Sequence, residues 1–184
     1  MVTSSALQIE SFDSAAVPTI ARLHATSWRK AYRGILTDTY LDDDLEAERR
    51  AVWTAKLAAP DAGPGWLARV NNEAVGFVYV RPREDPRWGT LIDNLHVLAG
   101  HQGLGIGRLL LHTVGTWTSA HAPNAAVHLW VFAENHPARE FYRLMGGAEV
   151  EFVDRAASDG RDLPEYRVAW TSPAALMAAT APKR

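Results

Sequence analysis

The sequence predicts an α/β fold in which helices flank a mixed, largely antiparallel central sheet of about six to seven strands. Segments that look like strands, with alternating or continuous apolar residues, recur along the whole chain. Segments with helical spacing of apolar residues lie between some of them. In the middle of the chain, the strand 90–98 runs directly into a glycine-rich loop and a helix. A strand–loop–helix unit within this order is typical of the α/β class.

The first half of the chain contains two predicted helical regions between strands. LQIESF at 7–12 alternates apolar and polar residues, as a strand does. Asp13 and Ser14 are candidate N-caps for a helix with a helically spaced apolar stripe: Val17, Ile20, Ala21, His24 and Trp28. Further predicted elements are a helical region at 36–57, a loop at 59–65, a hairpin of 66–70 and 74–80, and a polar loop at 81–89.

The second half continues with a helix that ends near Ala120, where Leu110, Val114 and Trp117 form one apolar stripe. A buried-type strand at 125–132, a short helix at 136–146 and strands at 148–154 and 164–170 follow. Residues 172–184 are expected to be a loose tail. We therefore expect one domain over 1–184, with its core at about 7–171.

Composition excludes several classes of function. The 184 residues carry a net charge of −2, so a basic nucleic-acid-binding surface is not expected. There is no cysteine, which excludes disulfides, cysteine nucleophiles and thiolate metal sites. The seven histidines show no metal-ligand spacing, so no metal is expected. Neither a signal peptide nor a membrane span is expected, and a cytoplasmic protein is the natural interpretation.

The stretch HQGLGIGRLL at 101–110 is the sharpest local signal. It lacks the Gly-x-x-x-x-Gly-Lys-Ser/Thr pattern of nucleoside-triphosphate loops, and position 108 is arginine where a dinucleotide fingerprint needs glycine. It does match Gln/Arg-x-x-Gly-x-Gly/Ala through Gln102, Gly105 and Gly107. The first N–H groups of a helix carry partial positive charge, and glycines let a diphosphate approach them. A loop that only makes a tight turn is the alternative.

A second signal lies downstream, where Asn135 precedes Tyr142 by seven residues at a strand-to-helix junction. With the glycine loop, this pattern resembles the GNAT superfamily of N-acetyltransferases over about residues 7–171, most clearly at 91–108 and 129–146. The resemblance implies a GNAT-type fold in which the strand before the loop splays from its neighbour and holds the cofactor, acetyl-CoA. It implies cofactor contacts at the following positions: Leu95, His96, Val97, Gln102, Gly103, Leu104, Gly105, Ile106, Gly107, Arg108, Asn135 and Tyr142.

The resemblance also implies catalytic roles. The Val97 backbone N–H would polarise the thioester carbonyl, and Tyr142 would protonate the departing thiolate, a role that suits a phenol. Core packing is the alternative for Tyr142, and a helix N-cap is one for Asn135. Trp130 and Leu91 stand where some family members carry glutamate.

Asp93 is the best acidic candidate for a general base or a substrate anchor. Strand alternation puts it on the face of Leu91, although a bulge would reverse this parity. His96 and Glu165 are weaker candidates for the base. Attack by an already neutral amine, with water carrying the proton, needs no base at all.

The segment 24–43 resembles a wall of the acceptor cleft in bacterial family members, with Trp28 and Tyr32 as substrate-binding candidates and Tyr40 beside them. The acidic run 42–46 could attract a cationic acceptor or simply begin a helix. The expected function is transfer of an acetyl group from acetyl-CoA to the primary amine of a small molecule or peptide. A non-catalytic acyl-CoA sensor and a different nucleotide-diphosphate ligand are alternatives, and a homodimer is conceivable.

Overall fold

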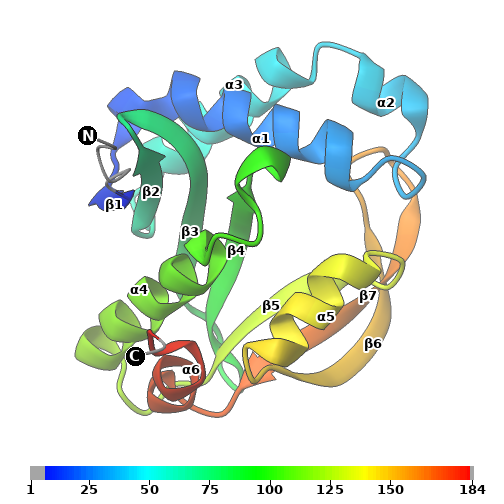
Figure 1. Ribbon diagram of the computed structural model, residues 1–184. Helices are drawn as coiled ribbons and strands as arrows, with labels where there is room; N and C mark the ends of the chain where they lie inside the picture. Colours follow the sequence, from blue (N-terminus) through cyan, green and yellow to red (C-terminus); the bar gives the residue numbers. More distant parts are fainter. Residues whose placement is uncertain (1–6, 183–184) are drawn as a thin grey trace.

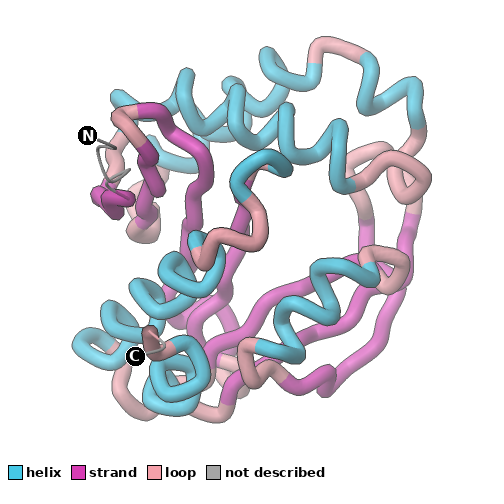
Figure 2. Tube along the Cα trace, viewed as in Figure 1, coloured by secondary structure: helices cyan, strands magenta, loops and turns pink. Residues whose placement is uncertain are grey.

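The computed structural model of the chain describes residues 7–182 and contains one seven-stranded sheet (Figures 1 and 2). The strands lie in the order β1-β2-β3-β4-β5-β7-β6, and every neighbouring pair is antiparallel except the parallel pair of β4 and β5. Their bounds are Leu7–Ser11, Gly65–Val70, Glu73–Asp85, Gly89–Val97, Val127–Phe132, Ala148–Ala156 and Asp162–Trp170 for β1 to β7. The predicted fold class is confirmed.

Six α-helices within the described residues cover both faces of this sheet. Their bounds are Val17–Ala31, Asp38–Asp42, Leu45–Ala58, Ile106–His121, His136–Leu144 and Pro173–Thr180 for α1 to α6. Helices α1 and α3 pack on the face of β3 that carries Phe77 and Tyr79. Helices α4, α5 and α6 pack on the opposite face, which carries Val78 and Val80.

Local sequence signals account for the first helices and the first hairpin. The Asp13 side chain accepts a hydrogen bond from the Ala15 backbone at 2.9 Å and begins a short 3₁₀ turn that leads into α1. The predicted helical region 36–57 divides into α2 and α3, and Thr37 and Asp44 are their N-caps. Between β2 and β3, Asn71 and Asn72 both have positive φ, as a tight two-residue hairpin turn requires.

The polar loop predicted at 81–89 is wrong over its first half. Strand β3 continues to Asp85, which pairs with Gly89 of β4. Pro82 lies between Arg81 and Asp85, where the register of the ladder shifts. A proline at such an irregularity removes no regular ladder hydrogen bond, so the strand tolerates it.

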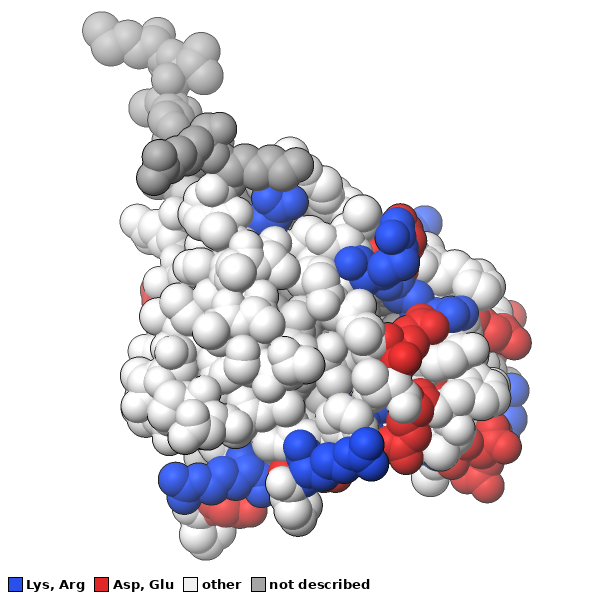
Figure 3. Space-filling view, turned by 90° about the horizontal axis from the view of Figure 1, so that it is seen from below, with Lys and Arg blue, Asp and Glu red and all other residues white. Residues whose placement is uncertain are grey.

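The expectation of a loose tail at 172–184 is also wrong for residues 173–180, which form α6. Ser172 caps this helix by accepting a hydrogen bond from Ala175 N at 3.1 Å, and Leu176 is fully buried against α4. Figure 3 shows that the underside of the molecule has few charged side chains on the side of α4 and α6, whereas charges gather on the side of β6 and β7. Helix α6 itself contains no charged residue.

Strands β4 and β5 separate soon after they begin. Only Thr90 with Val127 and Leu91 with His128 are paired in parallel, although both strands continue beyond these residues. Figure 1 shows β4 and β5 diverging toward α1. The splayed strand pair implied by the family resemblance is therefore present. None of the helices in residues 7–182 has the length and apolar character that crossing a membrane requires.

Candidate active site

A cavity of about 190 Å³ lies between the separated parts of β4 and β5. Helix α1 and the end of β6 form its outer walls, and α5 contributes Tyr142 from the opposite side. The cavity brings together seven candidate residues named from the sequence: Trp28, Tyr32, Asp93, Leu95, His96, Tyr142 and Glu165.

Asp93 lies at a β-bulge in β4. Tyr79 of β3 pairs with Asn94, and Val80 pairs with Ile92, so Asp93 has no partner in the ladder. Ile92 packs in the core on the α4 side, and Ile92 and Asp93 both line the cavity. The Asp93 carboxylate forms an ion pair with Lys56 of α3. The bulge thus places a carboxylate at the cavity with a cation behind it.

Tyr142 is buried on α5, and its ring packs edge-on against Phe141 and Trp170. Burial raises the pKa of Tyr142 well above its ordinary value, and the nearby Tyr32 phenol raises it further. A raised pKa keeps the phenol protonated, because desolvation disfavours the phenolate. The side chain is therefore a neutral proton donor at the wall of the cavity.

His96 is buried on β4, and its Nδ1 lies 3.1 Å from the Ser27 hydroxyl of α1. Burial, with a smaller effect of the Arg49 charge, lowers the pKa of His96 to about 3. An imidazole with so low a pKa is a weak proton acceptor at neutral pH. The low pKa does not favour His96 as the general base, and its contact with Ser27 suits a packing role.

Glu165 of β7, the other weak candidate for the base, also lines the cavity. Its carboxylate is almost fully buried and forms a 2.8 Å ion pair with Arg155 of β6. The two residues lie on the β6–β7 hairpin and close the wall next to Phe132, which is the cross-strand partner of Glu165. Glu165 is thus engaged by a cation, as Asp93 is.

At the end of β4, the peptide groups of Val97 form no hydrogen bonds with β3 and point toward the gap between β4 and β5. The N–H of Leu98 donates to the carbonyl of Val75 at 2.9 Å. Because bonded and non-bonded pairs alternate in an antiparallel ladder, the N–H and C=O of Val97 point away from β3. The Val97 carbonyl accepts a hydrogen bond from Gln102 Nε2 at 3.1 Å. Its N–H is thereby directed toward the side from which β5 has separated.

The glycine loop leads into the first turn of α4. Gly103 and Gly105 have φ of +78° and +82°, a conformation that strongly favours glycine, and open space surrounds the position of a Cβ at each. Gly105 is the N-cap of α4, and no side chain caps the helix. Gly107 is different, because a Cβ there would lie 3.0 Å from the Phe141 ring of α5. The loop leaves the positive end of α4 uncovered.

The remaining predicted cofactor residues have distinct environments. Leu104 is 66% exposed, whereas the Ile106 side chain is buried in the core, so Ile106 can offer a ligand only its backbone. Arg108 lies in the first turn of α4. Asn135 is the N-cap of α5, where its side-chain oxygen accepts from Ala138 N at 3.3 Å. Its side-chain nitrogen is not used in this cap.

Sequence reasoning did not predict Lys56 as the partner of Asp93, nor Trp130 and Phe132 as residues of the cavity wall. Lys56 could not be connected with Asp93, because helix and strand are brought together only by the fold. Trp130 and Phe132 follow from strand alternation, since both lie on the face of β5 opposite to Leu129 and Val131. The guanidinium groups of Arg155 and Arg167 lie over the Trp130 ring, 4.3 and 4.2 Å from its centroid.

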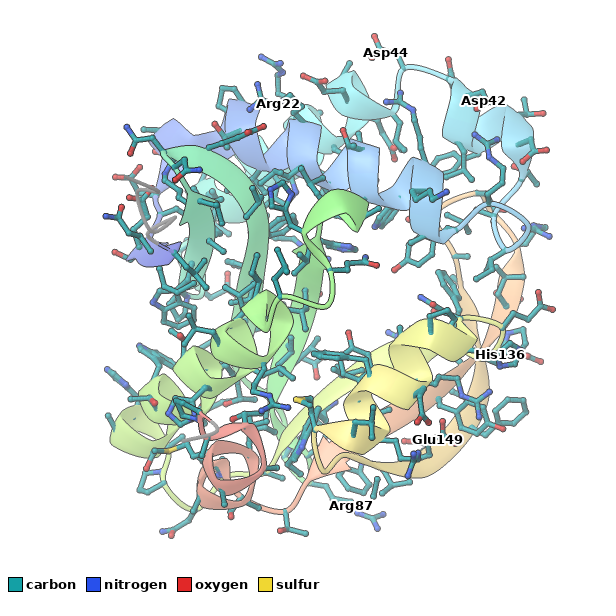
Figure 4. The ribbon with its side chains drawn as sticks, viewed as in Figure 1. Arg22, Asp42, Asp44, Arg87, His136 and Glu149 are labelled. Atoms are coloured by element: carbon teal, nitrogen blue, oxygen red, sulfur yellow. The ribbon has the colours of Figure 1, made fainter. Side chains whose placement is uncertain are left out.

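The acidic run 42–46 serves the start of α3. Asp42 pairs with Arg33 at 2.7 Å, and Asp44 caps α3 by accepting from Ala47 N. Both labelled side chains lie on the outer surface in Figure 4. No group of three or more His, Cys, Asp or Glu side chains within residues 7–182 is arranged to hold a metal ion.

The model of a family described as the acetyltransferase (GNAT) family matches residues 23–146. A probable N-acetyltransferase of Mycobacterium tuberculosis is 30% identical over 129 residues, which cover 68% of this chain and 70% of that protein. An uncharacterized N-acetyltransferase of Methanocaldococcus jannaschii is 32% identical over 133 residues, which cover 67% of this chain. The match spans 54%, about half, of the length of that archaeal relative.

Solved structures share the fold at low sequence identity. The PaiA N-acetyltransferase of Thermoplasma acidophilum, crystallised with coenzyme A, has a TM-score of 0.68 at 13% identity, over 90% of this chain and 99% of that one. A GNAT-type N-acetyltransferase of Rhodopseudomonas palustris has a TM-score of 0.71 at 16% identity, over 93% of this chain and 98% of that one. At these identities the likeness concerns the fold.

Proposed function

Because this chain belongs to the acetyltransferase (GNAT) family, as an N-acetyltransferase that uses acetyl-CoA, we propose that it acetylates a primary amine by direct attack in a ternary complex. The observation that carries the proposal is the separation of β4 from β5, with Asp93 and Tyr142 lining the cavity between them. The absence of cysteine agrees with a mechanism without a thiol nucleophile.

The residues present fit the thioester substrate. The peptide groups of Leu95 to Val97 can form strand-like hydrogen bonds with an extended arm in the gap, because β5 does not pair with them. The uncapped N-terminus of α4 and residues 102–108 can hold a diphosphate. Asn135 lies at the start of α5 and can contact the arm between these two points. Acetyl-CoA supplies the activated acetyl group.

The reaction forms one bond and breaks one. The neutral amine nitrogen attacks the thioester carbon, the new N–C bond forms and the C–S bond breaks. The Val97 N–H donates to the carbonyl oxygen while negative charge develops there. Tyr142 donates its proton to the departing thiolate, and the proton released by the amine passes to Asp93 or to water.

Calorimetric titration tests the binding half of the proposal. We expect saturable binding of acetyl-CoA and none of NAD or ATP, because the loop lacks both competing phosphate-binding patterns. The matched ligand is desulfo-CoA, which keeps the diphosphate and the arm but has no thioester. Failure of a folded protein to bind acetyl-CoA would refute the proposal.

Turnover tests the catalytic half. Thiol release from acetyl-CoA is followed with a panel of primary amines, and mass spectrometry identifies the acetylated product. Release that depends on an amine supports transferase activity. Tight binding of acetyl-CoA without turnover of any amine would favour the acyl-CoA sensor instead.

A further inference from the structure

We propose that the acceptor is a small primary amine attached by a short chain to a single aromatic ring, and not the amine of a peptide or protein. This inference rests on the proposed function, because it concerns the acceptor that enters the same cavity. Three features carry it: the rings that line the cavity, its small size, and a set of hydrogen bonds that joins two of its walls.

Aromatic side chains form much of the lining. The Tyr32 ring packs edge-on against Phe132 at 5.0 Å between centroids and lies 5.4 Å from the Trp28 ring. Trp130 and Tyr142 line the same space. The guanidinium groups of Arg155 and Arg167 both lie over the Trp130 ring. An aromatic ring of a ligand gains edge-to-face contacts in such surroundings that an alkyl chain of equal size does not.

The polar groups of the cavity suit one amine rather than a chain of polar groups. Asp93 lies on β4 and the Tyr142 phenol on α5, so an anionic and a neutral donor side chain both border the cavity. Both carboxylates of the cavity are paired with cations, Asp93 with Lys56 and Glu165 with Arg155. The cavity of about 190 Å³ must also admit the thioester end of acetyl-CoA, so only part of this volume is open to the acceptor, well below the roughly 300–1,000 Å³ typical of pockets for drug-sized ligands. The lining therefore fits a ring with a short aminoalkyl arm.

A clasp of four residues joins the walls on either side of the cavity: Ile35, Thr37, Asp159 and Arg161. The backbone N–H of Thr37 donates to the Asp159 carboxylate at 2.9 Å. Arg161 donates to the carbonyl of Ile35 at 2.6 Å and forms an ion pair with Asp159. The clasp thus connects the segment after α1 with the turn between β6 and β7 (Figure 1).

In the chain, both segments of the clasp come shortly after residues that line the cavity. Tyr32 precedes its first two residues, and Ser158, which also lines the cavity, precedes the other two. The Asp159–Arg161 ion pair lies within one turn, and the two hydrogen bonds that cross between the segments are Thr37 N–H to Asp159 and Arg161 to the Ile35 carbonyl. A polypeptide that left the cavity between these segments would have to break these hydrogen bonds. A small amine would not.

Acceptor preference tests the inference directly. The probes are 2-phenylethylamine, hexylamine, putrescine and a hexapeptide with N-terminal phenylalanine. We expect kcat/KM for 2-phenylethylamine to exceed those for hexylamine and putrescine at least tenfold, and that for the peptide at least a hundredfold. Efficient acetylation of the peptide or putrescine instead would overturn the inference and leave the proposed function intact.

A binding measurement keeps the test independent of turnover. In calorimetry with desulfo-CoA present, 2-phenylethylamine is expected to bind at least tenfold more tightly than hexylamine. Equal affinity, or no binding of 2-phenylethylamine, overturns the inference. If acetyl-CoA itself is not bound, the proposed function fails, and that result is read from a separate titration.

Two variants locate the effect. Phe132→Leu keeps an apolar side chain but removes a ring, and it should raise KM for 2-phenylethylamine about tenfold while changing KM for hexylamine little. Tyr32→Leu tests the neighbouring ring if Phe132→Leu does not fold.

Arg161→Ala opens the clasp and should raise the ratio of peptide to 2-phenylethylamine turnover at least fivefold. Arg50→Ala, which removes an exposed ion pair on α3, is the matched control and should leave that ratio unchanged.

Discussion

The indole N–H of Trp53 donates a hydrogen bond to Nδ1 of His24 at 2.9 Å, and both side chains are buried. Because Nδ1 accepts, it carries no proton, and His24 is neutral in the folded protein. The His24 ring also lies 4.7 Å from that of His96, and Arg49 is close enough to affect both. Two neutral imidazoles and a cation thus share the interior between α1, α3 and the sheet.

This arrangement predicts that the protein loses stability in mild acid. Burial lowers the pKa of His96 to about 3 from an ordinary value of 6.5, and it lowers the pKa of His24 as well. The unfolded chain therefore binds more protons than the folded one between these values, so stability falls as pH falls below 6.5. His96 alone accounts for about 2 kcal/mol between pH 7.5 and 5. Urea unfolding at the two pH values measures the loss.

A matched pair of variants assigns the effect. His96→Gln removes the titration and should clearly reduce the difference between the two pH values, whereas His136→Gln, at the exposed start of α5, should leave it unchanged (Figure 4). Equal free energies of unfolding at pH 7.5 and 5 for the natural sequence would contradict the prediction.

Substitution at Gly105 should separate backbone strain from charge. A Cβ at this N-cap meets no atom within 4 Å, so Gly105→Ala, Gly105→Gln and Gly105→Glu share the cost of a positive φ, roughly 1 kcal/mol. Only the glutamate adds negative charge where the diphosphate is proposed to bind. We expect Gly105→Glu to weaken acetyl-CoA binding at least tenfold more than Gly105→Gln in calorimetry. Equal affinities for a folded pair would refute a diphosphate at this loop.

Much of the fold could be predicted because its signals are local. The alternation of apolar and polar residues indicates the strands. The glycine loop and Asn135 lie at helix starts, where a pattern of a few residues indicates their role. The partner of Asp93 could not be predicted in this way. Lys56 is 37 residues distant, and a bulge in β4 decides where the carboxylate lies. The clasp between Thr37 and Asp159 depends on the same long-range assembly.

The sequence contains a helix-start signal for α6 that did not decide the prediction. Ser172 followed by Pro173 is a typical helix start, yet the position of the segment at the end of the sequence led to the expectation of a tail. What stabilises the helix is its contact with α4, where Gly115 leaves room: a Cβ there would lie 2.8 Å from Met177 Cγ. Such a contact between distant segments has no local signature.

Leu176→Ala should therefore destabilise the whole protein. Leu176 is fully buried in the main core with residues of α4 and the sheet. Removing its methyl groups leaves a cavity, and a loss of roughly 2–5 kcal/mol is expected. Urea unfolding measures this loss, and Ala174→Ser, on the exposed side of α6, is the control. A loss below about 0.5 kcal/mol, the range of surface substitutions, would mean that α6 contributes little to the core.

Tyr142→Phe should lower kcat much more than it weakens acetyl-CoA binding. The substitution keeps the buried ring beside Trp170 and removes only the proposed proton donor. General acid catalysis contributes roughly 10²–10⁴-fold, so kcat should fall within this range while the dissociation constant for acetyl-CoA changes less than threefold. Tyr166→Phe, on β7 and outside the cavity lining, should retain full activity.

The pH dependence separates proton donation from packing. Burial and Tyr32 raise the pKa of Tyr142 above its ordinary value of 10, so the phenol keeps its proton through the alkaline range. Ionisation of Tyr142 should therefore cause no fall in kcat up to pH 10. For Tyr142→Phe, an acceptor-linked thiol release that equals the natural rate would eliminate Tyr142 as the acid. The proton would then reach the thiolate from water, and the burial of this phenol would serve the core alone.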